Sequence, residues 1–147
     1  MYYATGKTKT QHDLETQRVP PRYGPVYLGF AYEDREEMKR IIDLRVDLMV
    51  QDGLFEEVRS LLRDGVPRTS TAFAAIGYKE ALAYLDGNAT RDDAVAEIKL
   101  RSRQYAKRQL TWLRRNQDIH WIYWEKEPDF SAGLQNATEY LTACGLR

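Results

Sequence analysis

The sequence has little of what builds disulfides, metal clusters and membrane spans. It holds one cysteine, Cys144, and two histidines, His12 and His120, far apart in the chain. A lone cysteine closes no internal disulfide and forms no thiolate cluster, and such scarcity is typical of a reducing cytosol. No apolar run approaches the roughly 20 residues that cross a bilayer, and the first ten residues lack the apolar core of a signal peptide. The sequence therefore predicts a cytoplasmic protein with no membrane partner and no histidine–carboxylate metal site.

Net charge is absent too, because 22 Lys and Arg residues balance 22 Asp and Glu residues, but the charges are unevenly distributed. Between Lys99 and Arg115, the stretch KLRSRQYAKRQLTWLRR holds seven basic residues and no acidic one. Like charges on one helix repel each other by a few tenths of a kcal/mol per neighbouring pair. Either a polyanion binds against this helix, or acidic residues elsewhere pair with it on a solvated face. Charge alone leaves both readings open.

Hydrophobic periodicity and turn residues predict a mainly helical chain with two short strands and about five helices. Residues 1–25 carry three prolines and predict a polar loop or tail that buries little. Strands are expected at 25–33 and 119–124, and helices over 34–51, 54–64, 78–86, 90–115 and 131–143. Two strands are too few for a covered sheet. Either the chain is mostly helical with one short strand pair, or the strands have partners outside these residues.

The tripeptide Gly6-Lys7-Thr8 looks like the end of a phosphate-binding loop, G-x-x-x-x-G-K-[ST]. That loop works because glycines after a strand aim several backbone N–H groups at phosphates. The first glycine would have to be Met1, and no strand is expected before it. We therefore interpret the tripeptide as a chance match. No G-x-S-x-G elbow, Cys–His pair or paired-carboxylate motif stands out elsewhere.

Arg45 falls on a face of the predicted helix 34–51 that should be apolar, shared with Met38, Ile41, Ile42, Leu48 and Met49. A buried guanidinium without an anion is very unfavourable. We expect Arg45 to contact either a buried carboxylate or a phosphate in a cleft, and the planar guanidinium suits phosphate.

Gln109 poses a similar question in the basic helix, where it shares the expected core stripe of Val95, Ile98, Ser102, Ala106 and Leu113. A buried amide without partners costs on the order of 1–3 kcal/mol. Gln109 is therefore either a satisfied structural amide or an amide that faces a substrate in a cleft.

Three segments together resemble the carboxy-terminal half of the tRNA dimethylallyltransferases, in that family's order and spacing. They are RVDLMVQDGLFEEVRSLL (45–62), AAIGYKEALAYLDG (74–87) and RSRQYAKRQLTWLRR (101–115), followed by a tryptophan strand at Trp121. The resemblance covers roughly 26–124, and YYATGKTKTQ fits the segment just before it. It implies an α/β fold, predominantly helical here, that forms the carboxy-terminal part of a P-loop kinase-like core. Residues 1–25 would be a tail or loop adjoining the family's inserted helical lobe, and residues 26–147 would belong to the core.

The same resemblance implies a reaction: transfer of a dimethylallyl group from dimethylallyl diphosphate to the N6 amine of an adenosine next to the tRNA anticodon, with Mg²⁺ as cofactor. It implies diphosphate contacts for Arg35 and Arg45. The implied contacts to the tRNA anticodon stem-loop are Ala74, Ala75, Ile76, Gly77, Tyr78, Lys79, Arg103, Lys107, Arg108, Gln109, Leu110, Thr111, Trp112, Leu113 and Arg114.

The chain departs from the family pattern in two ways. The family often has an arginine four residues before Arg45, where this chain has Ile41, and the adjacent Arg40 points about 100° away around the helix. The family's phosphate loop, metal ligands and catalytic aspartate have no counterpart in these residues, so we assign no catalytic residue here. We expect the isolated chain to be inactive and to expose strand edges that favour self-association. A helical RNA-binding module without catalysis, or a helical domain that binds an acidic protein, remain the alternatives.

Overall fold

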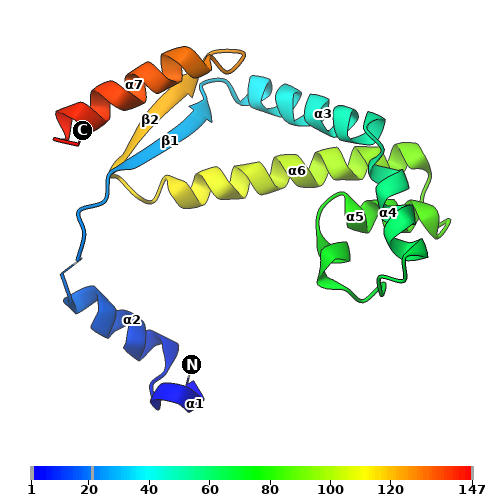
Figure 1. The fold of residues 1–147 in the computed structure, drawn as a ribbon, viewed down its shortest axis with the longest axis horizontal. Helices are drawn as coiled ribbons and strands as arrows, with labels where there is room; N and C mark the ends of the chain where they lie inside the picture. Colours follow the sequence, from blue (N-terminus) through cyan, green and yellow to red (C-terminus); the bar gives the residue numbers. More distant parts are fainter. Residues whose placement is uncertain (1, 21, 147) are drawn as a thin grey trace.

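The computed structural model describes residues 2–20 and 22–146, in which helices flank a single pair of strands (Figure 1). In chain order the elements are α1 (Tyr2–Thr5), α2 (Lys9–Arg18), β1 (Tyr27–Tyr32), α3 (Arg35–Gln51), α4 (Leu54–Arg63), the 3₁₀ turn η1 (Thr71–Ala74), α5 (Tyr78–Leu85), α6 (Arg91–Leu113), β2 (Ile119–Trp124) and α7 (Phe130–Ala143). Both expected strands and all five expected helices are confirmed. Their ends differ from the expected bounds by a few residues.

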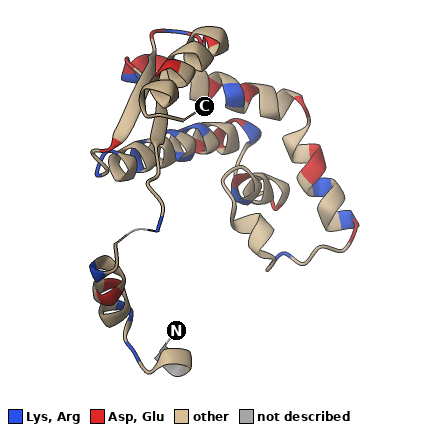
Figure 2. Cartoon of the chain, turned by 60° about the vertical axis from the view of Figure 1, so that its left-hand side comes forward, with Lys and Arg blue, Asp and Glu red and all other residues tan. Residues whose placement is uncertain are grey.

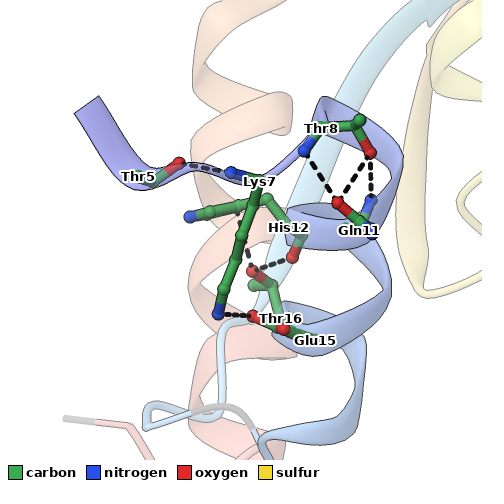
Figure 3. A network of polar contacts seen from close by, with 7 residues as sticks. All are labelled: Thr5, Lys7, Thr8, Gln11, His12, Glu15 and Thr16. Carbon is green, nitrogen blue, oxygen red and sulfur yellow. Dashed lines mark hydrogen bonds and ion pairs between the residues drawn. The ribbon is translucent and has the colours of Figure 1, made fainter. Parts of the chain in front are cut away.

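The expectation of a loop over residues 1–25 is wrong for α1 and α2, although α2 buries none of its residues. The side chain of Thr8 accepts a hydrogen bond from the backbone N–H of Gln11, and the side chain of Gln11 accepts one from the backbone N–H of Thr8 (Figure 3). This reciprocal capping box starts α2, and an ion pair of 2.6 Å between Lys7 and Glu15 supports it. Thr8 therefore caps a helix, and Gly6-Lys7-Thr8 follows α1 rather than a strand.

The two strands pair with each other in parallel, from Tyr27 opposite Ile119 to Tyr32 opposite Trp124. A parallel pair needs a long crossover, and the helices from α3 to α6 supply it. Among the described residues, the chain is thus mainly helical with one short strand pair. Partners for the strands outside these residues stay a prediction. Helix α7 lies along this pair (Figure 1), where Phe30 of β1 stacks on Trp124 of β2 with ring centroids 5.3 Å apart.

The buried core lies at the other end of the molecule, around α4 and α5. Phe55 and Val58 of α4, Phe73 of η1, Ala81 of α5 and Ala94 of α6 form one cluster. A second cluster joins Val46 of α3, Leu54 of α4 and Ile98 of α6. The sequence signals for these helices hold: Asp34 caps α3, and Thr90 forms a capping box with Asp93 at the start of α6. These contacts fix α3 and α6 against each other near their α4 ends.

The contact between α7 and the strands depends on Gly133, and a methyl group there should destabilise it. A Cβ atom at Gly133 would lie well inside van der Waals contact with the ring of Trp124, which its stacking on Phe30 holds in place. We expect Gly133→Ala to lower the free energy of unfolding by about 1–3 kcal/mol, the usual cost of overpacking. Chemical denaturation followed by tryptophan fluorescence measures this.

Gly24→Ala is the matched control, because no atom of the described residues lies within 4 Å of a Cβ atom built there. This variant should leave the midpoint of chemical denaturation unchanged. Equal stability of Gly133→Ala and the control would contradict this packing of α7.

Candidate functional site

A cavity of about 640 Å³ opens between α3, α6 and the segment that precedes α5. We call it the α3–α6 cavity. It brings together three stretches that are distant in the sequence, and its lining residues are Ile42, Arg45, Val46, Met49, Ala74, Ala75, Ile76, Ile98, Ser102, Tyr105, Ala106 and Gln109. Five of them are residues that the sequence assigned to diphosphate or tRNA: Arg45, Ala74, Ala75, Ile76 and Gln109.

Arg45 and Gln109 are both exposed. The expectation of a buried Arg45 on an apolar face is therefore wrong, and of the two readings of Gln109 the one as a buried structural amide is wrong. The α6 stripe is confirmed, since Ile98 on it is 1% exposed. Helix α3 instead buries the neighbouring face around Val46, which is 2% exposed and lies about 100° around the helix from Arg45. On α6, the packed contact ends before Gln109, and further along the helix the same face borders the cavity. A helical wheel predicts which face a residue shares, but not how far the neighbouring helix extends along that face.

Arg45 and Gln109 form no ion pair or hydrogen bond with any residue in the described ranges. No acidic residue lines the cavity either. The buried carboxylate expected as one partner for Arg45 is thus not present among the described residues. The alternative, in which these two groups face a ligand in a cleft, agrees with the geometry.

A second hollow, of about 350 Å³, lies between the first half of α3 and the second half of α6. We call it the basic groove. Its lining residues are Arg35, Met38, Lys39, Leu100, Arg103, Gln104, Lys107, Leu110, Thr111 and Arg114, five of them basic and none acidic. Arg35 therefore lies in a different hollow from Arg45, about 15 Å away along α3 at about 1.5 Å per residue. The structure does not bring the two expected diphosphate ligands together.

The charges of α6 divide into a paired half and an unpaired half, so each of the two explanations for this basic helix applies to one half. Lys99 and Arg103 reach across to α3, with ion pairs of 2.6 Å to Asp47 and Asp43, and Arg101 pairs with Glu97 at 2.6 Å. Lys107, Arg108, Arg114 and Arg115 have no carboxylate within 4.0 Å among the described residues. The Lys and Arg positions along α6 are visible in Figure 2.

Arg103 already binds a carboxylate, so its guanidinium is less available to a phosphate than an unpaired guanidinium would be. Its Nη1 donates to both carboxylate oxygens of Asp43, each at 2.6 Å, and both side chains are about one-third exposed. Arg103 was expected to contact tRNA, and that role stays a prediction. In this structure, its guanidinium ties α6 to α3.

Trp112 stands on the outer face of α6, where it is 68% exposed. Together with Gln104, Lys107, Arg108, Thr111 and Arg115 it lines a shallow hollow of about 480 Å³. Leu113 is half-buried instead. An exposed indole among cations is a surface typical of contacts with unpaired bases.

Hydrogen bonds hold the segment before α5 on one side, and its other side borders the α3–α6 cavity. Gly77 has φ of +99°, a conformation that favours glycine, and its backbone N–H donates to the buried carboxylate of Glu80 at 2.8 Å. The hydroxyl of Tyr78 donates to Glu57 at 2.5 Å, and this bond, with partial burial, raises the pKa of Tyr78 above its ordinary value. Ala74, Ala75 and Ile76 are left exposed at the α3–α6 cavity, and Lys79 is exposed beside them.

Sequence reasoning missed Tyr105, Ser102, Lys39 and Asp43. Tyr105 could have been found, because it lies four residues before Gln109 and therefore on the same helical face. Asp43 has no comparable signal, since its pairing with Arg103 joins residues that are 60 positions apart.

The described residues gather no group of three His, Cys, Asp or Glu side chains that could hold a metal ion. Within the same residues, no helix is both long and apolar enough to cross a membrane.

This arrangement of helices and strands recurs in solved structures of other proteins. The IPP transferase family model matches residues 1–116, and the chain belongs to that family. A tRNA dimethylallyltransferase of Halothermothrix orenii is 43% identical over 122 residues, which are 83% of this chain and 37% of that protein. The tRNA dimethylallyltransferase 1 of Citrifermentans bemidjiense is 47% identical over 141 residues, or 96% of this chain and 45% of that protein.

Two solved structures also match this chain. A tRNA isopentenylpyrophosphate transferase from Bacillus halodurans matches 88% of this chain and 42% of its own, with a TM-score of 0.76 at 34% identity. A tRNA delta(2)-isopentenylpyrophosphate transferase from Staphylococcus epidermidis matches 97% of this chain and 46% of its own, with the same TM-score of 0.76 at 33% identity. The expected fold class, a mainly helical carboxy-terminal part of a P-loop kinase-like α/β core, is confirmed. The chain spans less than half the length of these relatives.

Removing the hydroxyl of Tyr78 should loosen the segment that borders the cavity. We expect Tyr78→Phe to lower the free energy of unfolding by about 1 kcal/mol near pH 7. Because the folded-state pKa is raised above 10.0, the stabilisation from this hydroxyl is complete below pH 10 and is lost as the pH rises through the folded-state value. The difference between the two proteins should therefore shrink above pH 10.

Urea unfolding at several pH values measures this difference. Tyr123→Phe serves as the control, because the hydroxyl of Tyr123 makes no hydrogen bond among the described residues and its loss should change little. If Tyr78→Phe lowers the free energy of unfolding by the same amount from pH 7 to pH 11, the bond to Glu57 is not the cause.

Proposed function

We propose that this chain forms the RNA-facing and diphosphate-facing part of a tRNA dimethylallyltransferase. The reaction moves a dimethylallyl group from dimethylallyl diphosphate to the N6 amine of an adenosine next to the tRNA anticodon. Membership of the IPP transferase family and the names of the relatives support this assignment. The catalytic machinery is assigned to the part of such an enzyme that these residues do not match.

One observation carries the proposal beyond the family match. Arg45, the Ala74–Ile76 segment and Gln109 come from three separate parts of the sequence, and the resemblance assigns them to diphosphate or tRNA. All of them line one cavity of about 640 Å³, without an acidic residue among its lining. A purely structural role for these residues would not require them to share an open cavity.

The chemistry of these residues fits both substrates. Diphosphate leaves as a concentrated negative charge, and an arginine held nearby stabilises that charge. Arg45 and Arg35 are the candidates, each in its own hollow. The unpaired cations of α6, Lys107, Arg108 and Arg114, are suited to the phosphates of the tRNA backbone.

Mg²⁺ belongs to this reaction as we propose it, where it would neutralise charge on the diphosphate. The described residues offer no cluster of ligands for it, so this chain is assigned no part in binding the metal. The proposal also places the protein in the cytoplasm with its tRNA substrate.

Charge removal on the second half of α6 provides the direct test. Lys107→Ala and Arg108→Ala should each weaken binding of an anticodon stem-loop, because each removes one contact to a phosphate. The slope of log K against log salt should fall by somewhat less than one per variant, and all stem-loop sequences should be weakened alike. Fluorescence anisotropy over a series of salt concentrations measures both quantities.

Arg59→Ala is the matched control, since Arg59 of α4 is exposed and its guanidinium lies 3.6 Å from Glu56 on the same helix. It should keep the affinity and slope of the unaltered chain. If the α6 variants behave like this control, the unpaired charges are a solvated surface and the assignment of α6 to tRNA is wrong.

We also expect the chain to self-associate through the surface around α7 and β1. Phe30, Phe130 and Leu134 are 52%, 77% and 70% exposed there and line an apolar hollow of about 350 Å³. Sedimentation velocity over a range of protein concentrations should show a rising mean mass, and Leu134→Asp should reduce it. A concentration-independent monomer would contradict this expectation.

A further inference from the structure

Tyr105 is an aromatic side chain in the α3–α6 cavity to which the proposed function assigns no task. It is 49% exposed and lines the cavity, where it is the only aromatic residue among the described lining residues. The guanidinium of Arg108 lies over the ring, 5.8 Å from its centroid. A tyrosine that stabilised the core would be buried, so its place at an open cavity indicates a role in binding.

Gln109 follows Tyr105 by one helical turn and lines the same cavity. Residues at this spacing project side by side, with Cβ atoms about 5–6 Å apart. The amide of Gln109 has no hydrogen-bond partner among the described residues, so both its donor and its acceptor are available. A flat ring and a free amide thus stand next to each other on one wall.

The other walls leave room for a flat ligand. Small side chains border the cavity at Ala74, Ala75, Ser102 and Ala106, and Ile42, Val46, Met49, Ile76 and Ile98 give it an apolar floor. Its volume of about 640 Å³ falls within the range of about 300–1,000 Å³ of small-ligand sites. A phosphate group alone would leave the apolar floor uncovered, whereas a planar base would cover it.

We propose that the α3–α6 cavity receives one unpaired nucleobase of the bound RNA, with the base stacked on Tyr105 and its polar edge hydrogen-bonded to the amide of Gln109. Proteins recognise single-stranded RNA by this combination of aromatic stacking and hydrogen bonds to a base edge. Arg45, in the same cavity, stays available for the diphosphate, as proposed above. This inference rests on the proposed function, because it requires that the chain binds RNA.

The test couples a protein variant to an RNA variant. The RNA is a short stem-loop with adenines in its loop, together with a set of versions that each carry one abasic loop position. Stacking on an aromatic side chain is worth about 1–3 kcal/mol per base, so Tyr105→Leu should weaken binding of the intact stem-loop about tenfold. At one abasic position this penalty should vanish, because the base that Tyr105 contacts is already missing.

Three further variants separate stacking from a loss of folding or of charge. Tyr105→Phe should bind like the unaltered chain, because the ring is kept. Tyr123→Leu, which changes a tyrosine of β2 that is 48% exposed, should leave affinity unchanged. Gln109→Ala should lose its penalty at the same abasic position as Tyr105→Leu, and neither of these two variants should change the salt slope. Thermal melts confirm that each variant is folded.

The outcomes distinguish this inference from the proposed function. If the unaltered chain does not bind the stem-loop, both fail. If it binds with the expected salt dependence but Tyr105→Leu has no effect, or weakens every abasic version as much as the intact RNA, the chain binds RNA and the nucleobase site is wrong.

Discussion

The packing of α3 against α6 forms the two hollows in which most of the candidate site residues lie. Val46 and Ile98 are almost completely buried where the helices meet, and Asp43 and Asp47 on α3 bind Arg103 and Lys99 on α6. Isolated ion pairs at a surface contribute little, but these two reinforce an apolar contact. Beyond that contact, the helix faces that would otherwise be core become walls of open hollows. The same two helices thus provide both the rigid part of the structure and its candidate binding surfaces.

This arrangement explains why polar and apolar residues share one stripe on α6. Ile98 is 1% exposed at the packed end, whereas Gln109, three turns later on the same stripe, is exposed. The stripe changes from buried core to the wall of an open cavity without a break in the helix. A site carried by a continuous helix of 23 residues is held more rigidly than one carried by a loop.

Much of the fold could be predicted from local signals, because periodicity, capping residues and glycines act within a few positions of one another. The strands and the helices from α3 to α7 followed from such signals. Helix α2 was missed because it has no apolar face, even though the pair Thr8 and Gln11 forms a capping box. The burial of Arg45 was predicted wrongly because α3 buries the neighbouring face around Val46, and the choice of face depends on the helices that pack against it. The division of Arg35 and Arg45 between two hollows likewise depends on the crossing of α3 and α6, which no local pattern encodes.

The pairing of Arg103 with Asp43 and of Lys99 with Asp47 gives α6 a graded electrostatic field. Its first half is close to neutral. Lys107 and Arg108 in its second half, and Arg114 and Arg115 just after it, have no carboxylate partner in the part of the chain that the structure describes. Screening limits surface fields to about 8 Å at physiological ionic strength, so a polyanion that approaches from solution is attracted to that end alone. The gradient would therefore orient the polyanion before any specific contact forms, and this effect would weaken with added salt sooner than short-range stacking does. Asp43 and Asp47 of α3 neutralise only the first half of α6. In this way, they would determine the direction from which a polyanion approaches that helix.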